Sequence, residues 1–235
     1  MSKLSGVITA IITPFKSNGE LDTEGLRKNI QWQLECGIDG IAPLGTTGES
    51  STLSAAEKEI VIKIAREETK KQFPLIVGTG SYSTAQTIEN TSKAKDLGAD
   101  YAMIVTPYYN RPTQEGFFQH FKTIAESVNI PIIIYNNPHR TGQNMQNPTL
   151  YRLAEIPNIV GVKEASGSVM QFSEIVEHMR KHRKDFTILT GDDPLVLPTI
   201  ACGGHGVISV VSNLVPGPIR SFVQAALKND FKIGR

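Results

Sequence analysis

The chain repeats one unit eight times: a short apolar run rich in β-branched residues, then a longer stretch with apolar residues at helical spacing. The short runs have the length and composition of buried strands. We predict strands at 7–12, 38–42, 75–78, 101–105, 131–135, 159–163, 186–190 and 206–210. Because strands and helices alternate at about thirty residues per unit without a linker, the sequence predicts an α/β fold closed into a (β/α)8 TIM barrel.

Local signals support the helices between these strands. Segments 54–57 and 168–171 have the pattern of a capping box, in which two side chains satisfy unpaired backbone amides where a helix begins. Gly37 and Gly98 stand where a helix ends just before a strand, as C-terminal caps do. The last predicted helix covers about 215–228.

An open, doubly wound sheet is the alternative fold. It requires a glycine-rich turn after the first strand to hold a phosphate, and segment 13–19 does not have this pattern. With 235 residues, 40% of them hydrophobic, and no low-complexity segment, we expect one barrel domain over 1–235.

Charge and cysteine content argue against several classes of function. The net charge is +1, so no overall field attracts nucleic acid or a membrane surface. Cys36 and Cys202 lie far apart and fit reduced thiols rather than a disulfide framework or a zinc site. The first residues lack the apolar core of a signal peptide and no apolar run could span a bilayer, so we expect a cytoplasmic protein.

Lys163 is the residue on which the predicted chemistry depends, because it ends the apolar run at 159–163. A lysine there either caps the strand at the surface or lies desolvated, and desolvation lowers its pKa because burial penalises the charged form. A neutral amine suits Schiff-base formation with a carbonyl substrate. Taken alone, the surface cap is the better interpretation, so the other strand ends must decide.

Polar residues follow the other strands at the end where a barrel places its active site. Thr46 and Thr47 lie between glycines whose amides suit a carboxylate. Tyr135 ends the fifth strand, and Arg140 offers a planar donor fork five residues later. The structural alternatives are an ordinary turn for the threonines and a surface salt bridge for Arg140. Further candidates are Tyr108 and Tyr109, whose alternative is interface or rim packing, the Gly191-Asp-Asp193 turn, whose alternative is a helix N-cap, and the glycine-rich segment 203–209.

The histidines form no competing site in the sequence. His120, His178 and His182 fall on predicted helices, where we expect them to be solvated, and His139 and His205 fall in loops without ligand spacing. The acidic residues are scattered over helix caps and faces that we expect to be solvated. We therefore predict no metal site.

A desolvated lysine, a tyrosine, hydroxyl groups and an arginine at one end of a barrel fit one mechanism. The lysine condenses with a 2-oxo acid, and the iminium draws electrons from the adjacent carbon. A tyrosine hydroxyl moves the protons, and the enamine attacks an aldehyde.

Throughout its length the sequence resembles the pyruvate-dependent class I aldolases, the family typified by dihydrodipicolinate synthase and N-acetylneuraminate lyase. The matching motifs fall in order on the predicted strands, at 45–49, 108–112, 135–142 and 161–165. The paired threonines and Arg140 resemble the synthase branch, whereas the lyase branch would favour serine in place of Thr46 and no arginine at Arg140. The resemblance implies condensation of pyruvate with L-aspartate 4-semialdehyde to 4-hydroxy-tetrahydrodipicolinate, on the route to diaminopimelate and lysine.

The resemblance also implies four catalytic residues. Lys163 would form the Schiff base with pyruvate, without any other cofactor, and Tyr135 would donate and accept protons. Thr46 would link Tyr135 to Tyr109, which in the family reaches in from a neighbouring subunit of a homodimer or homotetramer.

Four further residues are implied in substrate binding. Thr47 and the backbone of Ile208 would hold the pyruvate carboxylate. Arg140 would bind the carboxylate of the aldehyde, and Gly191 would line the pocket.

The chain departs from the family pattern in two ways. Family members continue past the barrel with several more helices, so we expect a barrel that lacks this C-terminal extension, with consequences for the tetramer and for stability. Positions that match the lysine-binding residues of lysine-inhibited members are Ala55, Lys58 and Gln86, so we expect weak or absent inhibition by lysine.

Two other functions stay open. A 2-keto-3-deoxy sugar acid aldolase or N-acetylneuraminate-type aldolase would use the same lysine but would not need Arg140. A non-catalytic 2-oxo acid binder would bind pyruvate without turnover.

Overall fold

The computed structural model describes residues 4–230 and 232. Its strands pair in parallel in the order β2-β1-β8-β7-β6-β5-β4-β3. A further parallel bridge joins Ile41 to Leu75, so the sheet closes into a barrel. The strands are β1 (Gly6–Thr9), β2 (Gly40–Ile41), β3 (Ile76–Gly78), β4 (Tyr101–Val105), β5 (Ile132–Asn136), β6 (Ile159–Glu164), β7 (Thr187–Thr190) and β8 (Gly206–Ser209).

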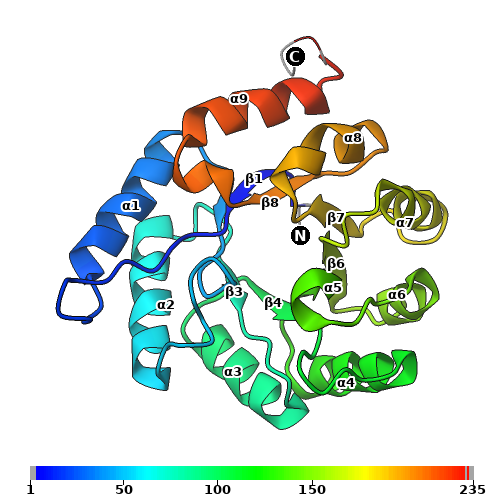
Figure 1. The fold of residues 1–235 in the computed structure, drawn as a ribbon, viewed down its shortest axis with the longest axis horizontal. Coiled ribbons are helices and arrows are strands. Elements are labelled where there is room, and N and C mark those ends of the chain that lie inside the picture. The colour runs from blue at the N-terminus through cyan, green and yellow to red at the C-terminus, as the bar shows by residue number, and fades with distance from the viewer. Residues whose placement is uncertain (1–3, 231, 233–235) are drawn as a thin grey trace.

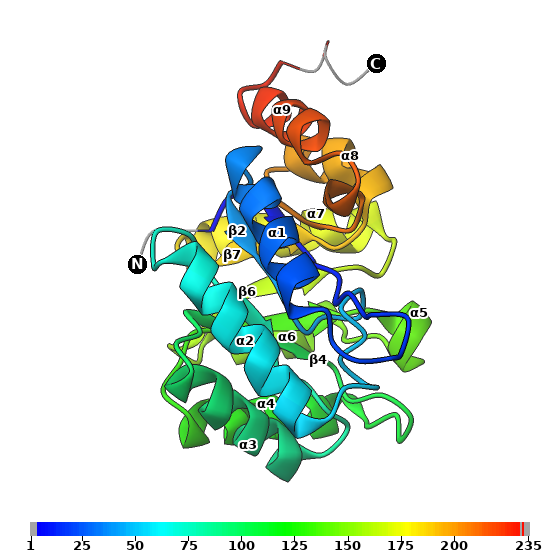
Figure 2. The ribbon, with the colours of Figure 1, turned by 90° about the vertical axis from the view of Figure 1, so that its left-hand side faces the viewer.

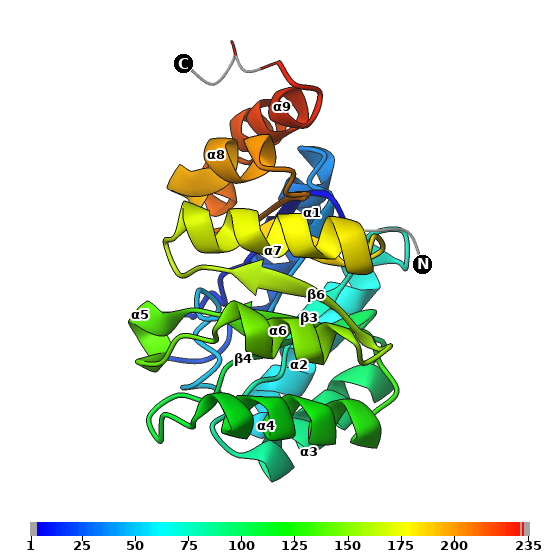
Figure 3. The same cartoon turned by 90° about the vertical axis from the view of Figure 1, so that its right-hand side faces the viewer.

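Helices surround these strands as an outer ring (Figure 1). The helices are α1 (Thr23–Glu35), α2 (Ala55–Thr69), α3 (Thr84–Asp96), α4 (Gln114–Ser127), α5 (Pro138–Thr141), α6 (Asn147–Ala154), α7 (Val169–His182), α8 (Val196–Ala201) and α9 (Pro216–Leu227), with the 3-10 turns η1 (Asp193–Leu195) and η2 (Val211–Asn213). The short α5 lies on the side toward which the arrowhead of β6 points (Figure 3). It therefore lies at the carboxyl end of the strands.

The predicted (β/α)8 barrel is confirmed, and each predicted strand overlaps an observed one. The largest difference is in β1, which ends at Thr9 rather than at residue 12. The predicted last helix at 215–228 matches α9. The predicted one-domain span 1–235 includes residues 1–3, 231 and 233–235, which lie outside the described part of the chain.

The core has two layers, one on each face of the sheet. Ile132 and Ile134 of β5 pack toward the helices, whereas Ile133 and Tyr135 pack inside the barrel. This alternation follows from the two-residue period of a strand. It directs the side chain of Tyr135 into the barrel interior.

Two capping predictions have different outcomes. At the start of α2 the reciprocal capping box of Ser54 and Glu57 is present. At the start of α7, Ser168 accepts from the backbone of Gln171, but the Gln171 side chain turns away to Asn144 and Glu164. The second capping box is therefore only half formed, because a buried carboxylate competes for the glutamine amide.

Gly37 and Gly98 act as predicted after α1 and α3. Both have positive φ, 83° and 93°, a backbone conformation that glycine adopts without steric cost. The chain leaves each helix there and enters the following strand.

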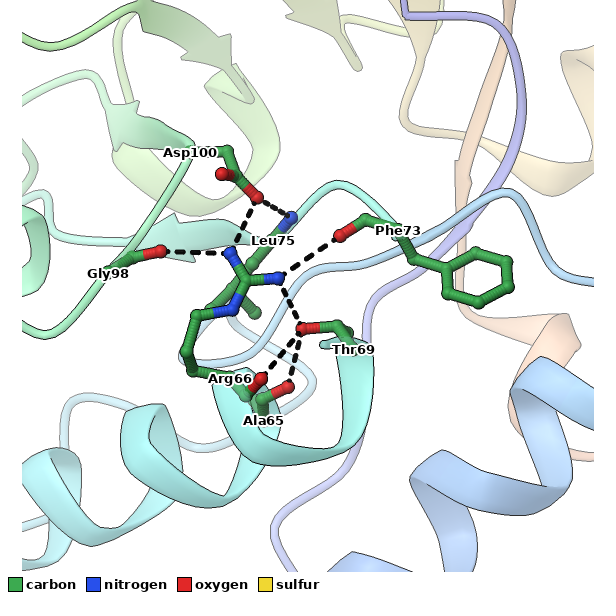
Figure 4. Close-up of polar contacts among 7 residues, drawn as sticks. All are labelled: Ala65, Arg66, Thr69, Phe73, Leu75, Gly98 and Asp100. Atoms are coloured by element: carbon green, nitrogen blue, oxygen red, sulfur yellow. Dashed lines mark hydrogen bonds and ion pairs between the residues drawn. The ribbon is translucent and has the colours of Figure 1, made fainter. Parts of the chain in front are cut away.

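At the amino end of the strands, Arg66 ties three segments together (Figure 4). Its guanidinium donates to the carbonyl oxygens of Gly98 and Phe73 and to the carboxylate of Asp100, the last at 2.9 Å. The Asp100 carboxylate also accepts from the backbone N–H of Leu75. The end of α2 is thereby fixed to the chain before β3 and before β4. Figure 2 shows α2 between α1 and α3 on this side of the barrel.

The expectation of a solvated His120 is wrong. This side chain of α4 is 6% exposed and its Nδ1 lies 2.8 Å from the hydroxyl of Thr84. Burial lowers the pKa of His120 to about 4, so the ring is neutral in the folded protein. His178 is half-buried and stacks on Tyr151 of α6, with ring centroids 3.6 Å apart.

Among the described residues, none of the helices combines the length and the apolar character needed to cross a bilayer.

Candidate active site

Lys163 is buried inside the barrel, as the desolvated alternative predicts. Its side chain is 5% exposed, and β6 holds it between β5 and β7, opposite Tyr135 and Leu189. The Lys163 Nζ lies 4.1 Å from the centroid of the Tyr135 ring. Desolvation lowers the pKa of Lys163, and the nearby Tyr135, Asp193 and Asp192 oppose that shift without cancelling it. The amine is therefore easier to deprotonate than an exposed lysine.

Gly191 leaves room for this side chain. A Cβ atom at Gly191 would lie 2.8 Å from Cε of Lys163 and 2.8 Å from Cβ of Ala165. Because real Cβ atoms do not approach other atoms so closely, any other residue here would displace the lysine or the strand end. The absence of a side chain at this position thus shapes the site.

A cavity of about 450 Å³ opens above Lys163 at the carboxyl end of the strands, within the size range of small-molecule sites. Five of the predicted residues line it together: Lys163, Tyr135, Thr46, Thr47 and Arg140. Gly191 lines it as well, along with Asn137, His139, Ala165, Asp192, Asp193, Pro194 and Val210. The structure thus brings six of the eight predicted site residues to one place.

The two threonines belong to the loop between β2 and α2. The hydroxyl of Thr13 donates to the carbonyl of Gly48 at 2.8 Å, which fixes this loop to the chain after β1. Thr46 is exposed and Thr47 is half-buried. Both therefore present their hydroxyls from a loop that is anchored close by.

Arg140 lies on α5, directly after β5. The turn ends at Gly142, which has a φ of 75° and lies against the guanidinium of Arg111. This left-handed turn returns the chain toward α6, and Arg140 remains exposed at the cavity rim. A guanidinium there can bind a carboxylate from solvent through two parallel hydrogen bonds.

Tyr109 and Ile208 are not among the residues that line the cavity. Tyr109 is 90% exposed, with a φ of 68°, in the β4–α4 connection. Ile208 is fully buried in β8, next to Ile8 of β1. Among the described residues the hydroxyl of Tyr135 accepts from the amide of Asn137, at 2.8 Å, and no hydrogen bond joins it to Thr46.

Sequence reasoning missed Asn137 as a residue of this cavity, whereas Asp192 belongs to the Gly191-Asp-Asp193 turn that it named as a candidate. The signal for Asn137 was strand alternation, since residues two apart face the same side. Burial raises the pKa of Asp192, while nearby His139 and Lys163 oppose the shift. Asp193 instead accepts hydrogen bonds from Ser209 and from the backbone N–H groups of Val210 and Val211, so it fixes the chain after β8 and does not cap the helical turn that follows β7.

The expectation that acidic residues occupy solvated faces is wrong for Glu164. It is 4% exposed and faces away from the barrel interior, where it accepts from Ser166, Asn136 and Gln171. Burial raises the pKa of Glu164, and those hydrogen bonds oppose the shift. Asn136 also accepts from Met145, so the network holds the segment that returns from α5.

A second, larger cavity of about 770 Å³ lies beside α2 and α3 and does not include Lys163. It is lined in part by Ala55, Lys58 and Gln86, the three positions singled out for lysine binding. Weak or absent inhibition by lysine stays a prediction. Within the described ranges, no three His, Cys, Asp or Glu side chains gather as a metal site.

Comparison with known proteins gives a consistent result. The model of the dihydrodipicolinate synthetase family matches residues 3–233. The 4-hydroxy-tetrahydrodipicolinate synthase of Protochlamydia amoebophila is 55% identical over 232 residues, which is 99% of this chain and 77% of that protein.

Solved structures agree. The dihydrodipicolinate synthase of Aquifex aeolicus matches with a TM-score of 0.94 and 44% identity, over 99% of this chain and 78% of that one. A monomeric dihydrodipicolinate synthase variant matches with a TM-score of 0.94 and 40% identity, over 98% of this chain and 78% of that one. With a buried lysine at the mouth of a (β/α)8 barrel and these relatives, the chain belongs to the dihydrodipicolinate synthetase family.

Proposed function

We propose that the chain condenses pyruvate with L-aspartate 4-semialdehyde to 4-hydroxy-tetrahydrodipicolinate, through a Schiff base on Lys163. The observation that carries this proposal is the desolvated Nζ of Lys163, packed on the Tyr135 ring at the floor of a cavity whose rim holds Arg140. The curated relative described above bears the name of this activity.

The reaction begins when neutral Nζ of Lys163 attacks the ketone carbon of pyruvate. Loss of water leaves an iminium, which withdraws electrons from the neighbouring methyl carbon. Removal of a methyl proton gives the enamine, whose carbon attacks the aldehyde. The amino group of the aldehyde substrate then attacks the carbon of the iminium, which closes the ring and releases the amine of Lys163, so no other cofactor is needed.

The proton transfers are assigned to Tyr135, with Thr46 as its partner in a relay that continues to Tyr109. Support for Tyr135 comes from its position opposite Lys163 in the sheet. Thr46 shares the same cavity. General acid–base catalysis of this kind contributes about 10²–10⁴-fold to a rate.

Substrate binding is assigned to groups around the rim and floor of the cavity. Thr47 and the backbone of Ile208 would hold the pyruvate carboxylate, and Arg140 would bind the carboxylate of the aldehyde. Gly191 would leave space for the adduct, since a Cβ there overlaps Lys163.

We also propose that the chain acts as a homodimer or homotetramer, in which Tyr109 of one copy completes the site of another. Tyr109 is 90% exposed and is not among the residues that line the cavity of its own chain, and both observations support this arrangement. Measurement of mass in solution tests it, with Tyr109→Phe as a variant that should lower kcat. A monomer whose Tyr109→Phe variant keeps full activity would contradict it.

A turnover assay with both substrates tests the proposed function, and Arg140→Ala separates it from the sugar acid aldolases. We expect kcat/KM for the aldehyde to fall about 10²-fold, because a charged hydrogen-bonded partner is removed. Borohydride trapping of pyruvate should stay at the level of the unaltered chain. Unchanged turnover in Arg140→Ala would favour a different aldehyde. Pyruvate trapping without turnover of any aldehyde would favour a binder.

A further inference from the structure

Asn137 lies at the junction of β5 and α5, and its side chain does not cap α5 as an asparagine at this position usually does. Asparagine is among the residues that best cap a helix, by accepting a hydrogen bond from an amide of the first turn. Asn137 occupies the N-cap position of α5, yet its side chain makes no capping bond. Instead Nδ2 donates to the phenol oxygen of Tyr135 at 2.8 Å, in the buried interior.

The other half of this amide is left unsatisfied. The Oδ1 atom of Asn137 is buried and has no hydrogen-bond partner among the described residues. An unpaired buried acceptor costs about 1–3 kcal/mol, whereas a leucine of similar volume would fill the space without that cost. The amide is therefore poorly explained by packing, and its contact with Tyr135 is the feature that remains to be explained.

The backbone holds this amide in place. The carbonyl oxygen of Asn137 accepts from the backbone of Arg140 and Thr141 and from the Thr141 hydroxyl, at 3.0–3.1 Å. Because alternate strand residues face the same side, Asn137 and Tyr135 both point toward the barrel interior. The donor is thus set before any substrate enters.

We propose that Asn137 is a positioning residue that directs the proton of Tyr135 into the cavity. Its Nδ2–H occupies a lone pair of the phenol oxygen, so the hydrogen of the phenol must point elsewhere, toward the Lys163 adduct. The same bond strengthens when the oxygen becomes negative, because charge-assisted hydrogen bonds are about twice as strong as neutral ones.

This inference rests on the proposed function, in which Tyr135 exchanges protons with the pyruvate adduct. When the iminium forms, the phenol of Tyr135 gives its proton to the hydroxyl group that leaves as water, and the resulting phenolate oxygen then takes a proton from the methyl group of the iminium. The electron pair of the broken C–H bond forms the carbon–carbon double bond of the enamine, and the iminium nitrogen becomes neutral. Asn137 gains and loses no proton in this step.

The methyl proton transfer can be measured alone. In D2O without aldehyde, NMR follows the exchange of the pyruvate methyl protons for deuterium. Asn137→Asp keeps the size and the acceptor but removes the N–H, and Asn137→Leu removes both. We expect both variants to exchange about 10- to 100-fold more slowly. The final extent of borohydride trapping should equal that of the unaltered chain, because both variants keep Lys163. Full trapping also shows that each variant is folded.

Asn147→Leu is the matched control. Asn147 also has a buried Oδ1 without a partner among the described residues, but it lies at the start of α6 and outside the cavity. Its exchange rate should equal that of the unaltered chain at a temperature where circular dichroism shows it folded.

Exchange in Asn137→Asp within about twofold of the unaltered chain would overturn the inference, because an amide that accepts from the phenol could be replaced by a carboxylate. Equal slowing in Asn147→Leu would assign the effect to stability and overturn it as well. Failure of the unaltered chain to trap pyruvate would overturn the proposed function itself, and the inference with it.

Discussion

The two ends of the barrel use their buried polar groups differently. At the amino end, the Nη1 and Nη2 atoms of Arg66 donate to Asp100, Gly98 and Phe73, and only its buried Nε lacks a partner among the described residues (Figure 4). At the carboxyl end, Lys163 lies desolvated and the Oδ1 of Asn137 lacks a partner among the described residues. The first arrangement fixes chain segments to one another, whereas the second keeps reactive groups available at a cost in stability.

The largest effect is expected at the carboxyl end, from Lys163→Met. Activity should fall by on the order of 10⁴-fold or more, because the nucleophile is lost. The free energy of unfolding should rise by about 1–2 kcal/mol, because an apolar side chain replaces a desolvated amine. Turnover assays and urea unfolding measure the two quantities. A Lys163→Met variant that is both inactive and less stable than the unaltered chain would contradict the claim that the carboxyl end holds its reactive lysine at a cost in stability.

The converse is expected at the amino end, from Arg66→Met. The free energy of unfolding should fall by about 2–4 kcal/mol, since the Asp100 carboxylate and two carbonyl oxygens lose a charged donor. The kcat of the folded variant should stay within about twofold of the unaltered value.

Arg27→Met is the matched control for that experiment. Arg27 pairs with Glu67 and Glu68 between α1 and α2, where the Arg27 side chain is partly exposed to water, and ion pairs that water reaches contribute about 0–1 kcal/mol. If urea unfolding gives equal losses in the free energy of unfolding for the Arg66 and Arg27 variants, the contacts of Arg66 at the amino end have no special role in stability.

A third probe lies in the helical layer, away from both ends. His120 has a pKa of about 4 in the folded chain and about 6.5 when unfolded, so the unfolded state binds the proton first as the pH falls. Stability is full above pH 6.5 and should decrease by about 3 kcal/mol as the pH falls to 4. Urea unfolding of His120→Gln should show a shallower decrease than the unaltered chain over this window. Parallel curves would assign the acid sensitivity to other groups.

The smallest effect is expected at the cavity beside α2 and α3. The family resemblance, with Ala55, Lys58 and Gln86 at the positions concerned, predicts little inhibition by L-lysine, and the ammonium of Lys58 repels a second cation. Activity should change by less than about twofold when lysine is titrated to the millimolar range. Strong inhibition below one millimolar would contradict this prediction.

The fold was predictable because β-branched apolar runs and helical spacing alternate along the whole chain. The strand-end rule for barrels then predicts that Lys163, Tyr135 and Arg140 lie together. His120 was misplaced because helical periodicity alone does not show which polar residue faces a neighbouring helix.

Glu164 and Asn137 were missed for related reasons. Glu164 follows Lys163 in a strand that is buried on both faces, so a one-residue step moves it from the barrel interior to the helix-facing layer rather than to solvent. Asn137 has the sequence character of a helix cap; strand alternation places it on the same side as Tyr135, and its hydrogen bond to Tyr135 shows how it is used there.

Reduction of the chain with borohydride in the presence of pyruvate tests the central claim most directly. We predict one adduct per chain in the intact mass, located at Lys163 by peptide mapping and absent from Lys163→Met. An unmodified Lys163, or an adduct on a different lysine, would contradict the account.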